Sequence, residues 1–451
     1  MNTETRRGFI KKSVVVSAGL TVGAPMYIKN YMQKKPGEVI NVAVAGINDR
    51  GGYYGGTGHT ANFTKIKNSR VVAICDADVN CFPKAVADIE KMGGEKPETV
   101  VDFRELLDRK DIDVISIATP DYWHALMTIW SCQAGKDVYV EKPVSYNVVE
   151  GRKMVQAARK YNRIVQAGTQ YRSNRLSQKA VQLLMDGIVG EIYMGRGTVY
   201  RHRPSIGRVA DSAVPEGVNW DMYRGPAPMI PFNKNHFHYN WHWYWDTATG
   251  EFGNNGVHAM DRIRMAMKIN THPKKIGCCG GFYGWDSDQE VPNLQAATFE
   301  YENGKIMELE VRSLYSPEEG GILFFGTQGY AVLGINSFQT FMGPKKDPGL
   351  NLTVKDLEPD PVLDEYAAAG IEYHFVNFLD CVSSRKREDL LADIEEGHLS
   401  TAMMHLGNIA YLTGRKLIFK GETERFVDDD EANSFLTRKE YRKPYLLPEE
   451  V

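Results

Sequence analysis

A glycine-rich hexapeptide directly follows the first dense apolar run of the chain. Residues 39–45 read VINVAVA, and the next six read GINDRG. The first glycine permits a tight turn after a strand, the last permits close packing of a following helix, and the N–H groups between them can face a pyrophosphate. Asn replaces the usual middle glycine and tolerates unusual backbone angles. The pattern predicts a dinucleotide site made by Gly46, Asn48, Asp49, Arg50 and Gly51.

Asp76 follows the next apolar run, 71–75, and lies 25 residues after Gly51. A carboxylate at about this spacing can accept hydrogen bonds from both ribose hydroxyls and repels a 2′-phosphate. The spacing favours NAD as the cofactor, with NADP as the alternative. Asp78 is the second candidate for this role, and an ordinary strand-end carboxylate is the structural alternative.

A third chemical signal is an aromatic and histidine-rich segment, 235–246, that reads NHFHYNWHWYWD. Sugar C–H faces stack on aromatic rings while neighbouring polar groups bind hydroxyls. We expect a wall of a carbohydrate pocket here, with Trp241, His242 and Asp246 as contact residues. The alternatives are aromatic packing between domains and a zinc site in which His236, His238 and His242 converge with Asp246.

The elements around these residues alternate between strand and helix. Apolar, β-branched runs at 39–45, 71–75, 114–118 and 138–140 are separated by helical stretches such as 83–92 and 125–134. This alternation predicts a doubly wound parallel sheet. A helix at 148–161 and a short strand at 164–166 complete a Rossmann domain over 36–165.

The sequence pattern changes after Arg172. A helix is expected at 172–186 and a strand at 191–201, followed by an irregular stretch, 202–250, of a length that is usually functional. Further strands (294–301, 305–313, 321–326) and helices (372–383, 398–413) are expected. We predict a second domain over 166–420 and a charged C-terminal tail, 421–451, packed loosely over the surface.

The N-terminus resembles an export signal. Arg6-Arg7 precede a modestly apolar run, 13–25, which is shorter than the roughly 20 residues that a membrane span needs. We predict a twin-arginine signal over 1–35 and a periplasmic location. A frayed basic tail is the alternative, and no other apolar run predicts a membrane span.

Composition narrows the class of protein. The 451 residues are 43% hydrophobic and 25% charged, as in ordinary globular proteins. A net charge of −3 gives no basic field for nucleic acid. The six cysteines are too few for a disulfide scaffold, and none shows the CxxC spacing of a zinc or redox motif.

Two further motifs complete a resemblance. Residues 119–124 read TPDYWH, and 141–143 read EKP directly after an expected strand. With the glycine turn and Asp76, they resemble the Gfo/Idh/MocA family of sugar oxidoreductases. The likeness extends over nearly the whole chain after residue 35, including 166–170 (QAGTQ) and 253–261 (GNNGVHAMD).

The resemblance implies an N-terminal Rossmann domain and a C-terminal α+β domain built on a large, open, mainly antiparallel sheet. It implies a catalytic role for Lys142 beside the nicotinamide and for His258 as the acid/base. Oxidation of a hydroxyl develops negative charge on the substrate oxygen, which a lysine stabilises, and releases a proton, which a histidine accepts. It also implies no metal, and a homo-oligomer, dimer or tetramer. Further cofactor contacts are expected at Thr119, Pro120, His124 and Glu141, and weaker substrate contacts at Tyr171 and Arg172.

Asn254 departs from the family pattern. Many members carry Asp four residues before the catalytic His, whereas Asn cannot stabilise an imidazolium by charge. The pKa of His258 therefore lacks one upward influence. Asp246 or Asp261 is a candidate replacement, and Asn254 itself is a candidate substrate contact.

An exported enzyme that meets no pool of free NAD must regenerate its cofactor in place. We first expect an oxidoreductase that acts on a sugar or glycoside hydroxyl with a tightly held nicotinamide. The second expectation is a redox-neutral NAD-dependent glycoside hydrolase or lyase, an exception to two-carboxylate hydrolysis. The third is an inactive carbohydrate-binding protein that retains the cofactor.

Overall fold

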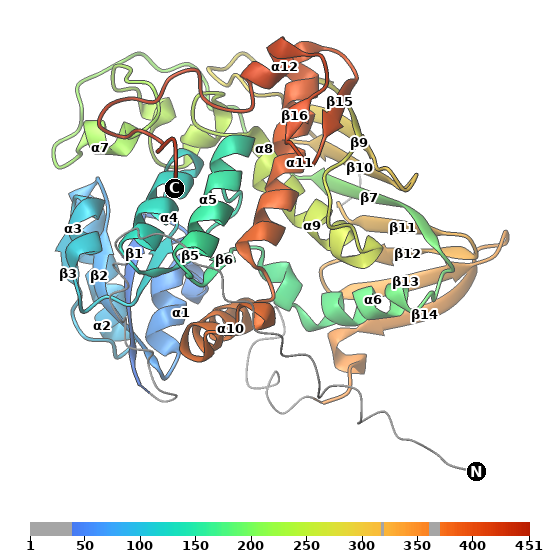
Figure 1. Ribbon diagram of the computed structural model, residues 1–451, viewed down its shortest axis with the longest axis horizontal. Coiled ribbons are helices and arrows are strands. Elements are labelled where there is room, and N and C mark those ends of the chain that lie inside the picture. The colour runs from blue at the N-terminus through green and yellow to red at the C-terminus, as the bar shows by residue number, and fades with distance from the viewer. Residues whose placement is uncertain (1–37, 317–319, 360–369) are drawn as a thin grey trace, which may run out of the picture. The chain divides into compact units, whose positions relative to one another are not determined.

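The N-terminal part of the described chain forms a six-stranded parallel sheet (Figure 1). The computed structural model describes residues 38–316, 320–359 and 370–451, so the predicted export signal lies outside it. The strand order β3-β2-β1-β4-β5-β6 is that of a dinucleotide-binding fold, in which ligands bind where the order reverses, between β1 and β4. The predicted Rossmann domain is confirmed. The strands are β1 (Ile40–Ala45), β2 (Ser69–Cys75), β3 (Glu98–Val100), β4 (Val114–Ile117), β5 (Asp137–Val140) and β6 (Val165–Ala167).

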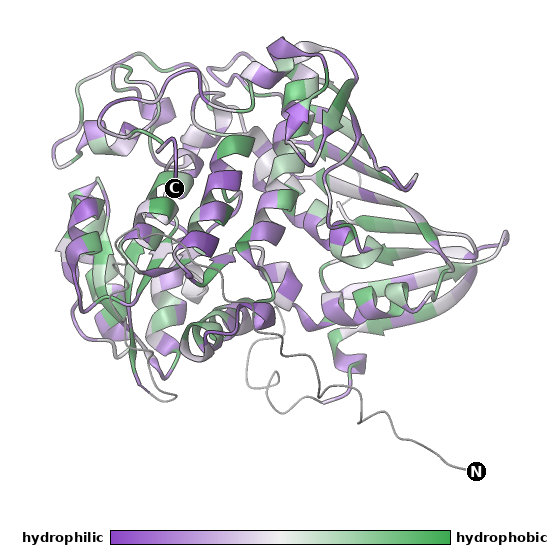
Figure 2. Ribbon diagram, in the orientation of Figure 1, coloured by the Kyte–Doolittle hydropathy of each residue, from purple (hydrophilic) through white to green (hydrophobic). Residues whose placement is uncertain are grey.

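Helices cover this sheet because its central strands are apolar on both faces. Every residue of β4 and β5 is buried, which explains why their sequences, VISI and DVYV, are mainly apolar. Figure 2 shows hydrophobic residues along the strands of this sheet. The expected helices at 83–92, 125–134 and 148–161 are present. The helices of this part are α1 (His59–Lys65), α2 (Phe82–Lys91), α3 (Phe103–Asp108), α4 (Asp121–Gln133) and α5 (Val148–Lys160).

The second sheet has ten strands in the order β14-β13-β12-β11-β7-β10-β9-β8-β15-β16. Only β7 and β10 pair in parallel, and the other neighbours are antiparallel, as the resemblance implied. The strands are β7 (Ile192–Tyr200), β8 (Lys275–Gly281), β9 (Leu294–Glu300), β10 (Ile306–Arg312), β11 (Ile322–Gly326), β12 (Gly329–Leu333), β13 (Ser337–Met342), β14 (Asp347–Thr353), β15 (Leu417–Lys420) and β16 (Arg425–Phe426).

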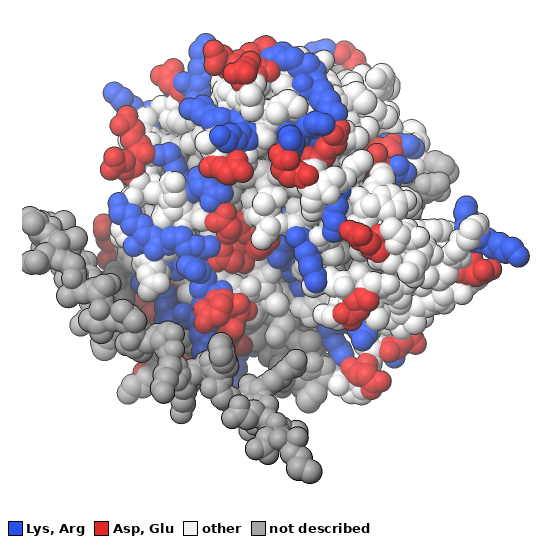
Figure 3. Space-filling view, turned by 45° about the vertical axis from the view of Figure 1, so that its right-hand side comes forward, with Lys and Arg blue, Asp and Glu red and all other residues white. Residues whose placement is uncertain are grey.

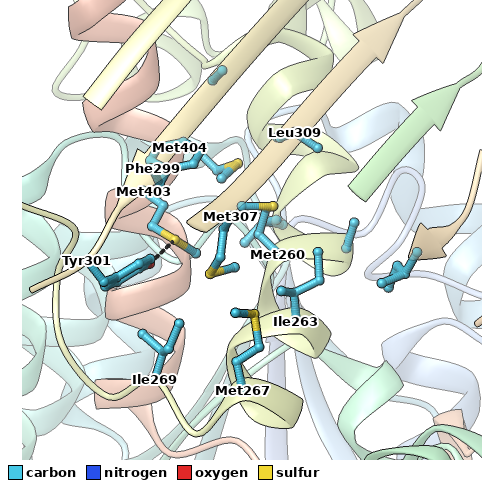
Figure 4. Packing of buried hydrophobic residues seen from close by; sticks show 14 of the residues in the cluster. Met260, Ile263, Met267, Ile269, Phe299, Tyr301, Met307, Leu309, Met403 and Met404 are labelled. Atoms are coloured by element: carbon cyan, nitrogen blue, oxygen red, sulfur yellow. Dashed lines mark hydrogen bonds between the residues drawn. The ribbon is translucent and has the colours of Figure 1, made fainter. Parts of the chain in front are cut away.

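One face of this sheet packs against α6 (Arg175–Met185), α9 (Gly256–Met267) and α11 (Ile394–Thr413). Burial therefore alternates along β10, where every second residue points into the core. Figure 4 shows the centre of this core, where side chains of α9, β10 and α11 interlock. Each such fully buried side chain contributes on the order of 1.5–3 kcal/mol. The labelled residues include Met260 and Ile263, Met307 and Leu309, and Met403 and Met404.

One late helix, α10 (Ile371–Ser384), completes the core of the first sheet rather than that of the second. The ring of Phe375 stacks on Tyr139 of β5 with centroids 4.4 Å apart, and it meets Phe63 of α1 edge-on at 5.0 Å. The two domains are therefore joined through a shared apolar core.

The C-terminal segment packs more tightly than expected. After α12 (Asp430–Ser434), Arg438 and Tyr445 are only 8% and 3% exposed. Tyr445 belongs to the core cluster beneath α4 and α5, and Lys153 of α5 donates to the carbonyl of Pro448. The tail is therefore less loosely packed than expected at this point, because Tyr445 contributes to that core.

Two surface properties follow from the described residues. None of their helices is both long and apolar enough to cross a bilayer. On the face shown in Figure 3, basic and acidic side chains are interspersed, as the near-neutral net charge predicts.

Candidate active site

A cleft of about 490 Å³ opens at the carboxyl ends of β1, β2, β4 and β5. In a parallel sheet these ends share one edge, so residues that follow different strands meet there. The second domain forms the opposite wall, through the segment after β7, the aromatic loop, and the end of α8 (Gly250–Asn254). From the first domain the lining includes Gly46, Asn48, Asp49, Arg50, Asp76, Thr119, Pro120, His124, Glu141 and Lys142.

The glycine turn has no room for side chains. Gly46 has a φ of +80°, and a Cβ there would lie 2.6 Å from the Thr119 nitrogen. A Cβ on Gly51 would lie 1.8 Å from the Gly46 carbonyl oxygen. Gly51 therefore packs against the turn itself, and α1 begins only at His59, which corrects the expectation that a helix follows the motif directly.

Asp76 faces the cleft beside this turn. One carboxylate oxygen accepts from the Ile47 N–H at 2.9 Å and the other from the Asp78 N–H at 3.1 Å. Burial raises the pKa of Asp76, while these N–H donors lower it. Asp78 instead contacts His238 Nε2 at 3.0 Å and does not line this cleft. Of the two candidate acids, Asp76 is therefore the one placed to meet a ribose.

The glycine turn, residues 46–51, and Asp76 together fit a dinucleotide. Gly46 lets the turn after β1 pass close to the backbone of residues 118 and 119, and the Asp76 carboxylate stands at the end of β2 with lone pairs remaining for ribose hydroxyls. When bound there, a nicotinamide supplies a hydride acceptor and donor.

Glu141 ties the glycine turn to the end of β5. Its Oε1 accepts from Arg50 Nε at 3.0 Å and from Gln170 Nε2 at 2.8 Å, and it contacts His59 Nε2 at 3.0 Å. Burial alone would raise the pKa of Glu141, but Arg50, His59 and Lys142 hold it well below its usual range. Glu141 is therefore ionised and fixes the loops around the cleft.

Lys142 is the cation at the centre of the cleft. Its Nζ donates to the Asn254 carbonyl at 3.0 Å and to Asn254 Oδ1 at 2.9 Å. Burial lowers the pKa of Lys142, although Glu141 and Asp121 act in the opposite direction. Because Asn254 is neutral, the ammonium has two fixed acceptors and no ion-pair partner among the described residues.

His258 lies close to Lys142 but does not line the cleft. Its ring meets Tyr171 edge-on with centroids 5.0 Å apart, and its Nδ1 is buried without a hydrogen-bond partner among the described residues. Burial and the Lys142 ammonium lower the pKa of His258 to about 3. At neutral pH the imidazole is uncharged, so it can accept a proton but cannot start as the acid.

No carboxylate replaces the missing acid at position 254 among the described residues. Asp246 pairs with the buried guanidinium of Arg224, and Asp261 pairs with Arg172 at 2.8 Å. The expectation that either would orient His258 is wrong, because each is held by an arginine. Arg172 and Asp246, and also Tyr171, lie outside the cleft lining, so the structure does not bring these three predicted contacts into the pocket.

His124 connects two of the loops that shape the cleft. Its Nδ1 lies 2.8 Å from the Pro143 carbonyl oxygen and its Nε2 lies 2.8 Å from the Thr119 carbonyl oxygen. Both nitrogens are thus engaged by backbone groups. His124 positions the loop that carries Lys142.

The aromatic segment is built of short 3₁₀ turns, Lys234–His236 and His238–Trp243. Trp241 and His242 stack at 3.7 Å and line the cleft, as predicted for a sugar-binding wall. The three histidines of the zinc alternative do not converge, because His236 stacks on Tyr244 and His238 contacts Asp78. The zinc alternative therefore has no support.

Among the described residues, one group has metal-ligand geometry, formed by His272, His398 and Glu424. Both histidine Nε2 atoms lie 2.7 Å from Glu424 Oε1. Arg152 donates to the same oxygen at 2.8 Å, so a guanidinium already occupies that side of the cluster.

Several residues that line the cleft were not predicted from the sequence. Asp121 is 3% exposed near Lys142, and burial raises its pKa well above the usual range. Its place in the 119–124 motif was a usable signal. Arg201 and Arg203 had no chemical signal in the sequence, whereas Tyr239 lies in the aromatic segment 235–246, which was expected to line the pocket.

Tyr445 closes the cleft at the far end, near Arg104 and Trp130. Its hydroxyl donates to Asp221 Oδ2 at 2.9 Å and its ring meets Trp123 edge-on at 5.1 Å. Arg442 also bonds Asp221 and donates to the Gly225 carbonyl at 3.0 Å. These contacts connect the C-terminal segment to residues 221–225, beside the cleft.

Two family models match the chain. The first, described as an oxidoreductase family with an NAD-binding Rossmann fold, covers residues 40–169. The second, described as the C-terminal alpha/beta domain of an oxidoreductase family, covers 203–313 and 349–447.

Solved structures of low sequence identity share the fold. Levoglucosan dehydrogenase in complex with NADH and L-sorbose has a TM-score of 0.64 at 17% identity, covering 84% of this chain and 99% of that chain. The WlbA dehydrogenase from Bordetella pertussis, in complex with NADH and UDP-GlcNAcA, has a TM-score of 0.61 at 19% identity, covering 85% and 99%.

Curated relatives match over a shorter stretch. A glycosyl hydrolase family 109 protein of Shewanella pealeana is 28% identical over 208 residues, which are 42% of this chain and 44% of that protein. An alpha-N-acetylgalactosaminidase of Shewanella oneidensis is 27% identical over 214 residues, 43% and 46%. The chain thus spans less than half the length of these relatives.

Proposed function

Because the chain belongs to the Gfo/Idh/MocA oxidoreductase family, we propose that it is an NAD-dependent enzyme acting on a hydroxyl of a sugar or glycoside. The observation that supports this proposal is that Lys142 lines one cleft together with the glycine turn, Trp241 and His242, with its ammonium hydrogen-bonded to Asn254. A cation there stabilises negative charge developing on a substrate oxygen.

The other residues have supporting roles. Asp76 would hold the ribose, and its negative charge favours NAD over a cofactor with a 2′-phosphate. Glu141 holds Arg50 of the glycine turn and the backbone N–H of Lys142 in fixed relative positions. His258, uncharged at neutral pH, would accept the proton of the substrate hydroxyl after a small approach or through a water, since it stands behind the lining.

A second candidate is a redox-neutral glycoside hydrolase or lyase, in which the sugar is oxidised transiently, the glycosidic bond is cleaved by elimination, and the sugar is reduced again. The matches to family 109 glycosyl hydrolases favour it.

We further propose that residues 1–35 direct export by the twin-arginine route to the periplasm, with the cofactor carried along, and that the enzyme works as a homo-oligomer, a dimer or tetramer. Arg6-Arg7 ahead of the apolar run support the first. The second domain's open sheet, covered by helices on one face, offers a surface for subunit pairing.

The first experiment identifies what the purified protein carries. Gentle denaturation followed by mass spectrometry should release about one NAD per chain. Absorbance at 340 nm with a panel of sugars and added NAD then separates the two candidates, because only net oxidation accumulates NADH, whereas a redox-neutral enzyme releases cleaved product without it.

Lys142→Met tests the assignment of the lysine. It should lower turnover at least 100-fold while leaving bound dinucleotide in place, with Lys355→Met, on a surface outside the cleft, as the control. A protein that releases no dinucleotide, or a Lys142→Met variant of full activity, would contradict the proposal.

A further inference from the structure

The wall that the second domain contributes to the cleft carries two arginines. Arg201 and Arg203 follow β7 and both line the cleft. The Arg201 and Arg203 N–H groups donate to the carbonyls of Arg312 and Ser313, so this segment continues alongside the end of β10. In an extended segment residues two apart share a face, which places both guanidinium groups on the cleft side.

Arg203 is already neutralised. Its Nε and Nη2 donate to Glu251 at 3.0 and 2.9 Å, and Glu251 is fully buried. Its guanidinium also lies over the rings of Tyr239 and Trp243 at 5.6 and 5.7 Å. Arg203 is therefore a fixed part of the wall.

Arg201 differs from Arg203 in having no ion-pair partner among the residues that the structure describes. It is exposed and lines the cleft, and its charge acts on Tyr239, as that of Arg203 does. Tyr239 also interacts with the side chain of Asn254, the residue that holds Lys142. Arg201 thus offers the cleft a guanidinium that no described carboxylate neutralises.

We propose that Arg201 forms a subsite for an anionic group on the substrate, so that the enzyme acts on a saccharide bearing a carboxylate or a sulfate ester. This inference rests on the proposed function of the same cleft. A planar guanidinium binds either oxyanion through two parallel N–H donors, and the Trp241 ring would hold the sugar face beside it.

The test compares matched methyl glycosides that differ only at C6, with a hydroxymethyl group, a carboxylate or a sulfate ester. The wild-type enzyme should prefer an anionic member in kcat/KM. Arg201→Gln should lower the ratio of anionic to neutral kcat/KM by about 10- to 100-fold, the range of hydrogen bonds to charged groups. The exposed Arg425→Gln, on β16, is the matched control and should leave the ratio unchanged.

The ranking of the carboxylate and the sulfate identifies which oxyanion is used. A preference for the neutral glycoside, or an unchanged ratio in Arg201→Gln, would overturn the inference. If no glycoside is turned over, the same ratio is measured as Kd from tryptophan fluorescence. The proposed function fails separately, through missing NAD or turnover that does not depend on Lys142.

Discussion

Replacing Asn254 by Asp should raise the pKa of Lys142 by one to two units. The substitution puts a carboxylate oxygen where Oδ1 lies 2.9 Å from the Lys142 nitrogen. Two unit charges at that distance attract by about 6 kcal/mol at an effective dielectric constant near 20. Desolvation of the new carboxylate cancels much of this, and hydrogen bonds to charged groups retain about 1.5–3 kcal/mol. At about 1.4 kcal/mol per pKa unit, this gives the expected shift.

Competitive acetylation of the protein across a pH series, read by mass spectrometry of the peptide containing Lys142, measures this pKa directly. Asn351→Asp, on the exposed strand β14, adds the same charge away from the cleft and should leave it unchanged. A Lys142 pKa that stays constant or falls in Asn254→Asp would show that the contact with Asn254 does not control the charge of the lysine.

Four further outcomes are expected. Gly46→Ala should lose bound dinucleotide and destabilise the fold by about 1–2 kcal/mol, because its φ is positive; mass spectrometry and urea unfolding check both. Tyr445→Ala should speed dinucleotide release several-fold, followed by loss of protein-bound cofactor during dialysis. The pKa values of His242 and His258 are about 3 in the folded protein, below the unfolded value near 6.5. Between pH 6.5 and 3 the unfolded chain therefore binds protons that the folded protein does not. The free energy of unfolding should fall over this range as the pH is lowered, by up to about 1.4 kcal/mol per pH unit for each histidine. Urea midpoints that rise on acidification would contradict this. Phe375→Ala should cost about 3–5 kcal/mol of unfolding free energy and lower the urea midpoint.

The parallel sheet was predictable because its evidence is local. Strands such as β1 and β4 are continuous apolar runs, and buried parallel strands require such runs. Six strands were missed: β3, β12, β13, β14, β15 and β16. Among these, β3 has three residues and β14 is a largely exposed edge strand whose sequence, DPGLNLT, shows no buried face. Short or edge strands are defined by their neighbours more than by their own sequence.

The cofactor end of the site was predictable, whereas the substrate end was predictable only in part, through Trp241, His242 and Asn254. Asp76 and Lys142 follow strands of one sheet, so topology alone brings them to one edge. Asp246 and Arg172 were expected in the pocket, but arginine and carboxylate partners that no local pattern could identify hold them elsewhere. Arg172 and Asp261 are 89 residues apart in sequence.

The placement of α10 constrains how the chain can mature. Tyr139 is synthesised more than 230 residues before Phe375, the ring that covers it. A fragment ending before residue 371 would leave an apolar surface on the nucleotide-binding half open to water, and such surfaces drive aggregation. The two domains therefore complete their folding together. A fragment of residues 38–169, expressed alone as a nucleotide-binding domain, should aggregate and be poorly soluble.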